Sequence, residues 1–194
     1  MTTTAKDYTA VLLAGGQSRR MGRPKALLPW KGQTIAQHLM AVVAPLVSSG
    51  LVVGTHDLPL AEGWTACLDQ HPGYGPVGAL ATALPRLNTP YGLVLSCDLP
   101  LLDRATLHHL LAGRGDASVA CFRTADGQVH PLIGVYAQSL GAHFEQALAV
   151  RHLRLLRVLR SLHPRVLPCP TALEVALTNV NTPEQYQQIY ATHH

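Results

Sequence analysis

Residues 10–28 read AVLLAGGQSRRMGRPKALL, a short apolar strand followed at once by a basic, glycine-rich loop. Gly15 and Gly16 let the backbone turn sharply and bring its N–H groups close to an oxyanion, an approach that a Cβ atom would obstruct. Arg19 and Lys25 supply positive charge, the arginine as a planar fork and the lysine as a point charge. A solvated basic loop is the alternative, but a glycine-rich turn directly after an apolar strand is typical of a phosphate site.

Apolar runs alternate with segments of helical periodicity along the rest of the chain. The run Tyr8–Ala14 is too continuous for a half-exposed strand, so it predicts a central, parallel one. Further strands are expected at Leu51–Gly54, Thr65–Leu68, Gly92–Cys97, Ala117–Phe122, Leu132–Tyr136 and 165–168. Helices are expected at Thr34–Ser49, Val77–Leu84, from an Asp103 cap to Ala112, at 138–149, at 151–162 and from Thr182 to Ala191. This alternation predicts an α/β protein, a three-layer α/β/α sandwich with a mostly parallel sheet.

Length, composition and charge limit the classes of protein that the chain can represent. With 194 residues, 47% of them hydrophobic, it can bury a substantial core, and residues 1–194 are expected to form a single domain. No stretch reaches the roughly 18 apolar residues of a membrane span, and the N-terminus lacks the layout of a signal peptide. The four cysteines show no CxxC spacing, which indicates reduced core residues of a cytoplasmic protein. The net charge of +4 suits an anionic small molecule and is too weak to indicate nucleic acid.

Ligand-binding loops in parallel sheets lie beyond the carboxyl ends of the strands. The loops at Gly15, Asp69 and Asp98 each follow a predicted strand and are expected to converge there. Asp98 follows the apolar run YGLVLSC, where a carboxylate has no packing role, and Asp103 is better placed to cap the next helix. Hard cations prefer oxygen ligands and take one or two carboxylates plus substrate phosphates. Asp98 is therefore predicted to bind Mg²⁺, with a turn or N-cap role as the alternative.

A second glycine-rich loop, GYGPVG at residues 73–78, matches the GxGxxG spacing of dinucleotide-binding proteins. It follows a predicted strand and opens a predicted helix, and Asp98 lies about twenty residues further on. Pro76, however, reduces the number of N–H donors, and the first strand already ends in a richer phosphate loop. A dehydrogenase of the Rossmann class is therefore disfavoured.

The string LAGG-x-S-x-RMG-xx-K-x-LL at residues 13–28 resembles the signature of nucleotidyltransferases of the molybdenum-cofactor group, within the clan of sugar-nucleotide pyrophosphorylases. Four further segments agree with that family in order and approximate spacing. They are LDQHPGYGPVGAL at 68–80, LSCDLPLL at 95–102, HPLIGVY at 130–136 and NVNTPEQY at 179–186. The five segments span nearly the whole chain, so the resemblance implies a Rossmann-like nucleotidyltransferase fold.

The resemblance also implies a nucleotide site. Backbone groups at the end of the first strand would orient the nucleotide; they belong to Leu13, Ala14, Gly15 and Gly16. Lys25 and Arg19 would stabilise the charge on the triphosphate, and Asp98 would bind the Mg²⁺ that accompanies it. These three residues are the expected catalytic groups.

The same resemblance assigns the nucleotide base to Asp69, as its hydrogen-bond acceptor, and to Gly75, which lets the backbone approach closely. A carboxylate can accept paired hydrogen bonds from the N1–H and 2-amino groups of guanine, whereas cytosine offers only its N4 amine. Gly16 completes LAGG, the opening of the guanylyl relatives, although LPW at residues 28–30 leans toward the cytidylyl relatives. The chain departs from the family pattern GPLxG, because Gly78 comes one position early and Ala79 stands where glycine is expected. GTP is favoured over CTP.

The acceptor side of the cleft is expected to include Asn179 and Asn181, where the resemblance places them; a turn and a helix cap are the alternative. His130 stands at the entrance of a predicted strand, and its role, structural or functional, is left open. Arginines recur every third residue from Arg151 to Arg160 and predict a broad basic helix face. That face is either a solvated surface or an electropositive wall for a phosphorylated pterin.

The resemblance implies a molybdenum cofactor guanylyltransferase, which transfers GMP from Mg-GTP to the phosphate of molybdopterin, giving the guanine dinucleotide and pyrophosphate. The acceptor phosphate would attack the α-phosphorus in line, so catalysis would be mostly positioning and electrostatics. Alternatives are a CTP-dependent enzyme with the same acceptor, a GTP:sugar-phosphate nucleotidyltransferase, and a non-catalytic cofactor-carrying partner. Transient contacts with molybdoenzymes or their chaperones are expected. Binding to nucleic acid or to a membrane is not expected.

Overall fold

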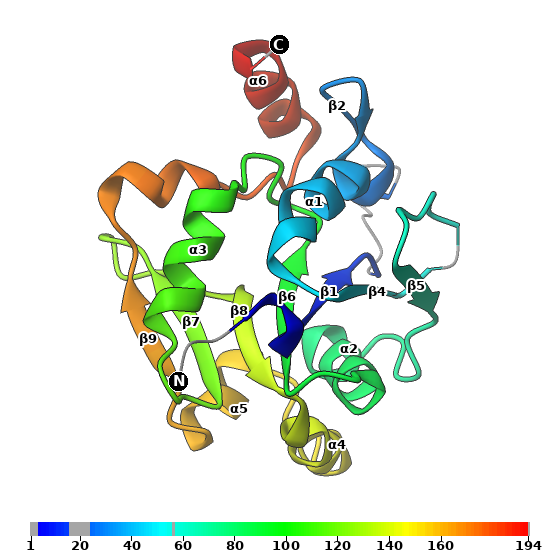
Figure 1. Cartoon of the computed structure of the whole chain (residues 1–194), viewed down its shortest axis with the longest axis vertical. Helices are drawn as coiled ribbons and strands as arrows, with labels where there is room; N and C mark the ends of the chain where they lie inside the picture. The colour runs from blue at the N-terminus through cyan, green and yellow to red at the C-terminus, as the bar shows by residue number, and fades with distance from the viewer. Residues whose placement is uncertain (1–3, 16–23, 56, 194) are drawn as a thin grey trace.

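One mixed sheet of seven strands forms the centre of the computed structural model, which describes residues 4–15, 24–55 and 57–193 (Figure 1). In spatial order the strands are β5 (Trp64–Cys67), β4 (Ser49–Val53), β1 (Tyr8–Leu13), β6 (Tyr91–Ser96), β8 (Val129–Ala137), β7 (Val119–Arg123) and β9 (Arg165–Pro168). β8 runs antiparallel to β6 and β7, whereas every other neighbouring pair in this sheet is parallel. The prediction of a mostly parallel sheet is confirmed.

Helices cover both faces of the sheet. They are α1 (Ile35–Val43), α2 (Gly75–Ala83), α3 (Arg104–Gly113), α4 (Gly141–Ala149), α5 (Leu155–Ser161) and α6 (Pro183–His193). Successive residues of β1 point to opposite faces. Ala10 and Leu12 pack with α1 and α3, whereas Val11 and Leu13 pack with α2, α4 and α5. Figure 1 shows α1 and α3 crossing in front of the sheet. Two helical layers around one sheet confirm the three-layer α/β/α sandwich.

The central strand behaves as its sequence predicts. All six residues of β1 are buried, and β1 pairs in parallel with β4 on one side and β6 on the other. A strand covered on both faces has no solvent side to carry polar residues, which explains its continuous apolar run. Its carboxyl end therefore delivers the following loop to the middle of one sheet edge.

The C-terminal helix connects distant parts of the chain at that edge. A small antiparallel hairpin, β2 (Pro29–Trp30) and β3 (Gln33–Thr34), follows the first loop, and Figure 1 shows α6 beside it. The rings of Tyr190 and His193 in α6 lie 6.2 and 6.3 Å from the Trp30 ring, centroid to centroid. This packing holds the segment that contains Lys25 against the segment that precedes α6.

The predicted helix Thr34–Ser49 is wrong in its second half. Thr34 caps the helix by accepting a hydrogen bond from the Gln37 N–H at 3.2 Å, but α1 ends at Val43. A short 3₁₀ turn that contains Pro45 follows, and the chain enters β4 already at Ser49. Proline has no N–H to donate and its ring clashes with the preceding turn, so the helical periodicity overran its true end.

The predicted helix at 151–162 is wrong at its start, because α5 begins only at Leu155. Arg151 has a left-handed backbone, with φ +55°, and Arg154 is the N-cap of α5. The Arg151 N–H donates to the Leu148 carbonyl oxygen at 2.9 Å, which closes the end of α4 instead of opening a new helix. Half of the arginine run therefore precedes the helix, and one continuous basic helix face does not form.

The predicted strand Leu132–Tyr136 is longer than expected, since β8 spans Val129–Ala137, and the strand before it runs to Arg123. A turn that contains Asp126 and Gly127 joins them, and Gly127 has a φ of +87°, a backbone conformation that glycine adopts readily in turns. Pairing with β7 on one side and β6 on the other extends the strand beyond its apolar run. His130 is the second residue of β8 and therefore lies at the entrance of this strand, as predicted.

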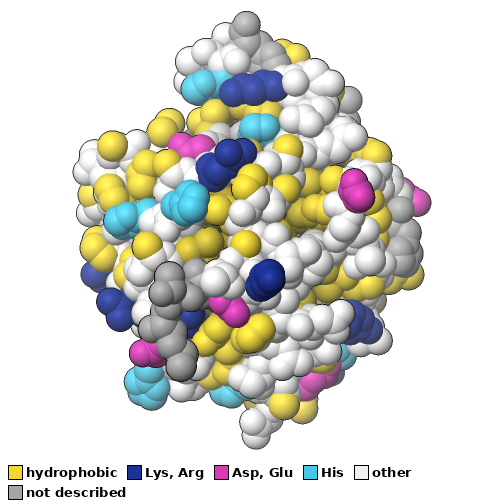
Figure 2. Space-filling model, viewed as in Figure 1, with side chains coloured by type: hydrophobic (Ala, Val, Ile, Leu, Met, Phe, Trp, Pro, Cys, Tyr) yellow, Lys and Arg dark blue, Asp and Glu magenta, His cyan; other side chains and the backbone are white. Residues whose placement is uncertain are grey.

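On the face that carries α1 and α3, charged side chains are scattered rather than collected in one patch (Figure 2). Figure 2 shows Lys and Arg side chains there in small groups, separated by apolar and acidic ones. Within the described part of the chain, no helix combines the length and the apolar character that crossing a bilayer requires.

Candidate active site

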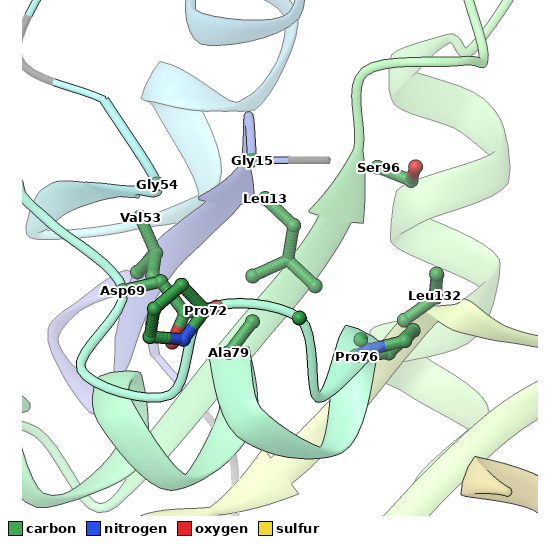
Figure 3. A pocket seen from close by; sticks show the side chains of 12 residues that line it. Leu13, Gly15, Val53, Gly54, Asp69, Pro72, Pro76, Ala79, Ser96 and Leu132 are labelled. Carbon is green, nitrogen blue, oxygen red and sulfur yellow. The ribbon is translucent and has the colours of Figure 1, made fainter. Parts of the chain in front are cut away.

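A cavity of about 690 Å³ opens at the carboxyl ends of the strands β5, β4, β1 and β6 (Figure 3). Each strand contributes a residue at or just beyond its last position; these are Asp69, Val53, Leu13 and Ser96. Figure 3 shows Asp69 and Pro72 on one side of the cavity and Ser96 and Leu132 on the other, with Leu13 between them. This is the edge at which open α/β sheets bind ligands. The structure thus brings the loops after Leu13 and around Asp69 together, as the sequence predicts.

Two glycines in close contact form the junction between the loops after β1 and β4. The N–H groups of Ala14 and Gly15 both donate to the Val53 carbonyl oxygen, at 2.9 and 3.1 Å. A Cβ atom on Gly54, whose φ is +111°, would lie 2.4 Å from the Gly15 Cα atom. Any other residue at position 54 would push the two loops apart at the wall of the cavity. Sequence reasoning missed Gly54, although a glycine at the end of a predicted strand was the available signal.

The predicted nucleotide-orienting backbone therefore has two of its donors already in use. In the described structure the N–H groups of Ala14 and Gly15 are bonded to protein oxygen, and Gly16 lies outside the described residues. Leu13 contributes an apolar side chain to the cavity, and Gly15 contributes a surface without a Cβ. What this strand end offers a ligand is close approach and apolar contact.

Asp69 is held by one of its two carboxylate oxygens. The Oδ1 atom accepts hydrogen bonds from the His71 backbone N–H at 2.9 Å and from the Thr82 hydroxyl at 3.0 Å. The Oδ2 atom has no hydrogen-bond partner among the described residues. Because Asp69 lines the cavity, this oxygen is available to a ligand.

The loop after Asp69 enters α2 through two glycines with a left-handed backbone. The φ angles are +88° at Gly73 and +64° at Gly75, a region that residues with a Cβ rarely adopt. Gly75 is the first residue of α2, and it lines the cavity together with Pro76. The N-terminal end of a helix carries partial positive charge, so this side of the cavity favours an electronegative ligand atom.

The departure from the family glycine pattern has a packing reason. A Cβ atom on Gly78 would lie 2.8 Å from the His71 carbonyl oxygen and 2.9 Å from the His71 Cβ atom. The loop above α2 can therefore settle on the helix only because residue 78 is glycine. Ala79, which stands where the pattern has glycine, lines the cavity with its methyl group.

Three predicted site residues from distant parts of the chain meet around the Lys25 ammonium. The Lys25 ammonium donates to the Asn181 side-chain oxygen Oδ1 at 2.7 Å and lies 4.0 Å from Asp98 Oδ2. Burial lowers the pKa of Lys25, while the Asp98 carboxylate acts in the opposite direction. The Lys25 and Asp98 side chains are 20% and 23% exposed, so their charges interact more strongly than they would on an open surface.

Asp98 keeps its other carboxylate oxygen without a partner. Asp98 Oδ1 is buried and accepts no hydrogen bond from the described residues. Such an atom costs free energy unless a ligand satisfies it. The described residues contain no group of three His, Cys, Asp or Glu side chains that could hold a metal alone. A hard cation at Asp98 would draw further oxygen ligands from a bound substrate, which is how Mg²⁺ is bound beside phosphates.

A smaller cavity of about 150 Å³, lined by Asp98, His130 and Asn179, adjoins the first. Leu132 lines both cavities. His130 is 8% exposed, and burial lowers its pKa, so its imidazole is neutral near pH 7. Its Nε2 atom lies 3.4 Å from the Thr124 hydroxyl oxygen. A neutral ring and an amide beside Asp98 give this second cavity a polar, uncharged wall.

Of two other predicted features, one falls outside the described residues and the other does not line the cavities. Arg19 lies outside the described residues. The arginines between Arg151 and Arg160 are exposed, and none of them is among the residues that line the two cavities. Residues that the sequence did not single out, by contrast, include Thr82, Ser96 and Leu132. Only a position after an apolar run marked Ser96, and nothing in the sequence marked the other two.

An open sheet with a carboxylate-bearing cavity at the carboxyl ends of its central strands defines the class of nucleotide-binding α/β proteins to which nucleotidyltransferases belong. Residues 10–166 match the family model described as the MobA-like NTP transferase domain. The chain belongs to this family. It is therefore a nucleotidyltransferase, and the resemblance carried by the five sequence segments is confirmed.

Individual relatives agree with this assignment over nearly the whole chain. The sequence is 31% identical over 189 residues to a probable molybdenum cofactor guanylyltransferase of Carboxydothermus hydrogenoformans, with 95% of each protein covered. It is 31% identical over 196 residues to a molybdenum cofactor guanylyltransferase of Xanthomonas euvesicatoria pv. vesicatoria, with 96% of each covered. The crystal structure of molybdopterin-guanine dinucleotide biosynthesis protein A from Archaeoglobus fulgidus superposes with a TM-score of 0.77 at 19% identity, covering 95% of this chain and 97% of that one. The last likeness shows the shared fold.

Proposed function

We propose that this protein transfers GMP from GTP to the phosphate of molybdopterin or its molybdenum-loaded form, producing the guanine dinucleotide and pyrophosphate. One observation carries the proposal: Lys25 contacts both Asn181 and Asp98, and Asp98 lines a cavity that shares Leu132 with the larger cavity lined by Asp69. The substrate class follows from the similar proteins, which are molybdenum cofactor guanylyltransferases.

In this proposal the guanine base occupies the larger cavity. Asp69 Oδ2 accepts hydrogen bonds from the base, since Oδ1 is occupied by the protein. Gly75 has no side chain to hold the base away from the start of α2. Leu13 and Val53 give the base apolar contact. A site that bonds a polar edge rejects bases that cannot complete those bonds.

The triphosphate lies toward Lys25 and Asp98. The unpartnered Oδ1 atom of Asp98 fits a hard cation, so Asp98 would hold Mg²⁺. Mg²⁺ bound there would neutralise charge on the triphosphate and on the departing pyrophosphate. Lys25, oriented by Asn181, stabilises the same charge as it develops, and Arg19 is proposed as a second cation.

The acceptor phosphate itself is the nucleophile, so the protein needs none. One of its oxygens forms a bond to the α-phosphorus of GTP, and the bond from that phosphorus to the bridging oxygen of pyrophosphate breaks. Asn179 and His130, at the smaller cavity beside Asp98, are proposed to position the acceptor. Delivery of the product to molybdoenzymes or their chaperones, and a cytoplasmic location, stay predictions.

The alternatives differ in nucleotide, in acceptor or in having no activity. CTP would leave one hydrogen-bond acceptor position of Asp69 unused, because cytosine offers a single amine on that edge. A sugar-phosphate acceptor is disfavoured because the similar proteins are molybdenum cofactor guanylyltransferases. A non-catalytic carrier would have no need of a lysine paired with a carboxylate that keeps one oxygen free.

Pyrophosphate release tests the function directly. The purified protein is incubated with Mg²⁺, purified molybdopterin and one nucleoside triphosphate at a time. We expect pyrophosphate from GTP, formation of the guanine dinucleotide, and no reaction when molybdopterin is omitted. Turnover with CTP alone, or with a sugar phosphate in place of molybdopterin, would replace the proposal with the corresponding alternative.

A further inference from the structure

The carboxylate that faces the base is fixed from behind by a buried threonine. Thr82 lies in α2 and is completely buried. Its hydroxyl donates to Asp69 Oδ1 at 3.0 Å and accepts from the Gln70 backbone N–H at 3.0 Å. The hydroxyl has one proton, and the Gln70 N–H can only donate, so the direction of both hydrogen bonds is determined.

These bonds decide which oxygen of Asp69 is left for a ligand. An ionised carboxylate offers about two acceptor positions on each oxygen. On Oδ1 both are filled, one by the Thr82 hydroxyl and one by the His71 backbone N–H. On Oδ2 both remain open among the described residues. The carboxylate is therefore held in one rotation, with a two-position acceptor available to the cavity.

Guanine presents two adjacent donors, N1–H and the 2-amino group, to such an acceptor, whereas cytosine and adenine each present one amine. A carboxylate that rotates freely accepts a single donor in many orientations and loses the preference for a pair. We propose that Thr82 is a positioning residue that determines nucleotide selectivity by fixing the rotation of the Asp69 carboxylate. The inference rests on the proposed function only in naming guanine as the preferred base.

The test compares three substitutions. Thr82→Val keeps the shape of the side chain and removes the hydroxyl, and Thr82→Ser keeps the hydroxyl. Thr106→Val is the matched control, because Thr106 is also a completely buried helical threonine but its hydroxyl has no partner among the described residues. Dissociation constants for GTP, CTP and ATP are measured by titration calorimetry without acceptor, and kcat and KM for GTP are measured with molybdopterin.

We expect Thr82→Val to weaken GTP binding about tenfold while CTP and ATP binding stay within a factor of two of the wild type. KM for GTP should rise and kcat at saturation should stay near the wild-type value, because the base is bound equally in the ground and transition states. Thr82→Ser and Thr106→Val should retain the GTP preference. If Thr82 had only a structural role, Thr82→Val would instead weaken the binding of all three nucleotides to the same extent.

Several results would overturn the inference. Wild-type selectivity in Thr82→Val, or an equal loss for all nucleotides, refutes the role of Thr82 and leaves the proposed function intact. If the wild type prefers CTP, the proposed base is wrong. The role of Thr82 in selectivity is then supported if Thr82→Val loses the preference for CTP and refuted if it keeps it. A wild type without any preference refutes both. If Thr82→Val does not fold, Thr82→Ala against Thr82→Ser gives the same comparison.

Discussion

The two sides of the cleft are built in different ways. On the base side, Asp69, Thr82 and Gly75 come from one short stretch of chain, and their geometry follows from a loop, two left-handed glycines and the start of a helix. On the phosphate side, Lys25 bonds to Asn181, which lies 156 positions further along the chain. The first side is assembled locally and the second by tertiary packing.

This difference separates selectivity from rate. The base side holds its carboxylate through hydrogen bonds of its own loop and helix, so it does not depend on α6. The phosphate side depends on the packing of α6 against Trp30, which brings the segments of Lys25 and Asn181 together. Changes on the phosphate side should therefore lower turnover without altering base preference, and changes on the base side should do the reverse.

The largest effect is expected at Asp98. Asp98→Asn replaces a charged oxygen ligand by a neutral amide and should lower kcat with GTP by about 10³-fold, since metal-assisted charge stabilisation contributes several kcal/mol. The fold should remain, because the Val180 N–H donates to the backbone carbonyl of Asp98, not to its side chain, at 2.7 Å. Steady-state kinetics across a Mg²⁺ titration and a melting curve are the measurements.

Asp103→Asn is the control for that variant. Asp103 is the N-cap of α3 and accepts from the Thr106 N–H at 2.8 Å, and asparagine caps helices about as well as aspartate. The control should keep wild-type activity and melting temperature. An Asp98→Asn enzyme with near-normal turnover and unchanged Mg²⁺ dependence would remove Asp98 from the metal site.

The second largest effect is expected at Lys25. If negative charge near the ammonium grows as pyrophosphate departs, Lys25→Ala should lower kcat about 10²-fold and raise KM for GTP much less. Arginine is not expected to rescue it, because a planar fork needs more room than an ammonium. The melting temperature should change little, since the polar contacts that alanine removes are one hydrogen bond to Asn181 and a 4.0 Å ion pair with Asp98, and such partly exposed contacts contribute little to stability.

Lys6→Ala is the control, since Lys6 is exposed and precedes β1, at the opposite end of the strand from the cleft. It removes the same charge and should leave kinetics unchanged. If Lys25→Ala were instead strongly destabilised, with normal kcat per folded molecule, Lys25 would be a structural residue. The phosphate side would then lack its proposed cation.

The fold was predictable because its signals are local. A continuous apolar run in Tyr8–Leu13 marks a strand buried on both faces, and Asp103 marks a helix start that the structure confirms. The predicted helix bounds were wrong where the backbone conformation departs from what the hydrophobic periodicity indicates. This happens at Pro45 and around Arg151. The antiparallel pairing of β7 with β8 had a local signal in the Asp126-Gly127 turn, whereas the pairing of β8 with β6 had none, since it joins distant segments of the chain.

The candidate site was predictable only in part, for the same reason. Asp69 and Asp98 stand directly after strands, so their convergence followed from the topology of a parallel sheet. That Lys25 reaches Asn181 depends on how α6 packs, which no short motif encodes. Thr82 was missed because a buried helical threonine looks like an ordinary core residue until its hydroxyl is seen to hold Asp69.

A smaller effect is expected on base preference. The wild type should use GTP at least ~10-fold better than CTP or ATP, as one well-placed hydrogen-bonding pair can provide. Asp69→Asn should remove most of that ratio, because its amide can keep an oxygen toward His71 and Thr82 but then presents N–H donors to the donors of guanine. Ratios of kcat/KM for the three nucleotides decide it, with the exposed Asp116→Asn as control. Equal wild-type rates with CTP would contradict the guanine assignment.

The smallest effect concerns His130 and the pH dependence of stability. Burial lowers the pKa of His130, and the carboxylates of Asp126, Asp98 and Glu174 only partly oppose this. As the pH falls below about 6.5, the unfolded chain therefore takes up a proton on this imidazole before the folded protein does, and stability is lost. His130→Gln removes this contribution, so the melting temperature of the wild type relative to the variant should be higher at pH 7.5 than at pH 5.5. The change in that difference should be below about 3 °C.

His38, whose pKa burial also lowers, is present in both proteins and cancels. A difference that grows toward low pH would mean that the folded protein stabilises the imidazolium, and His130 would then be a cation beside Asp98 on the phosphate side of the cleft.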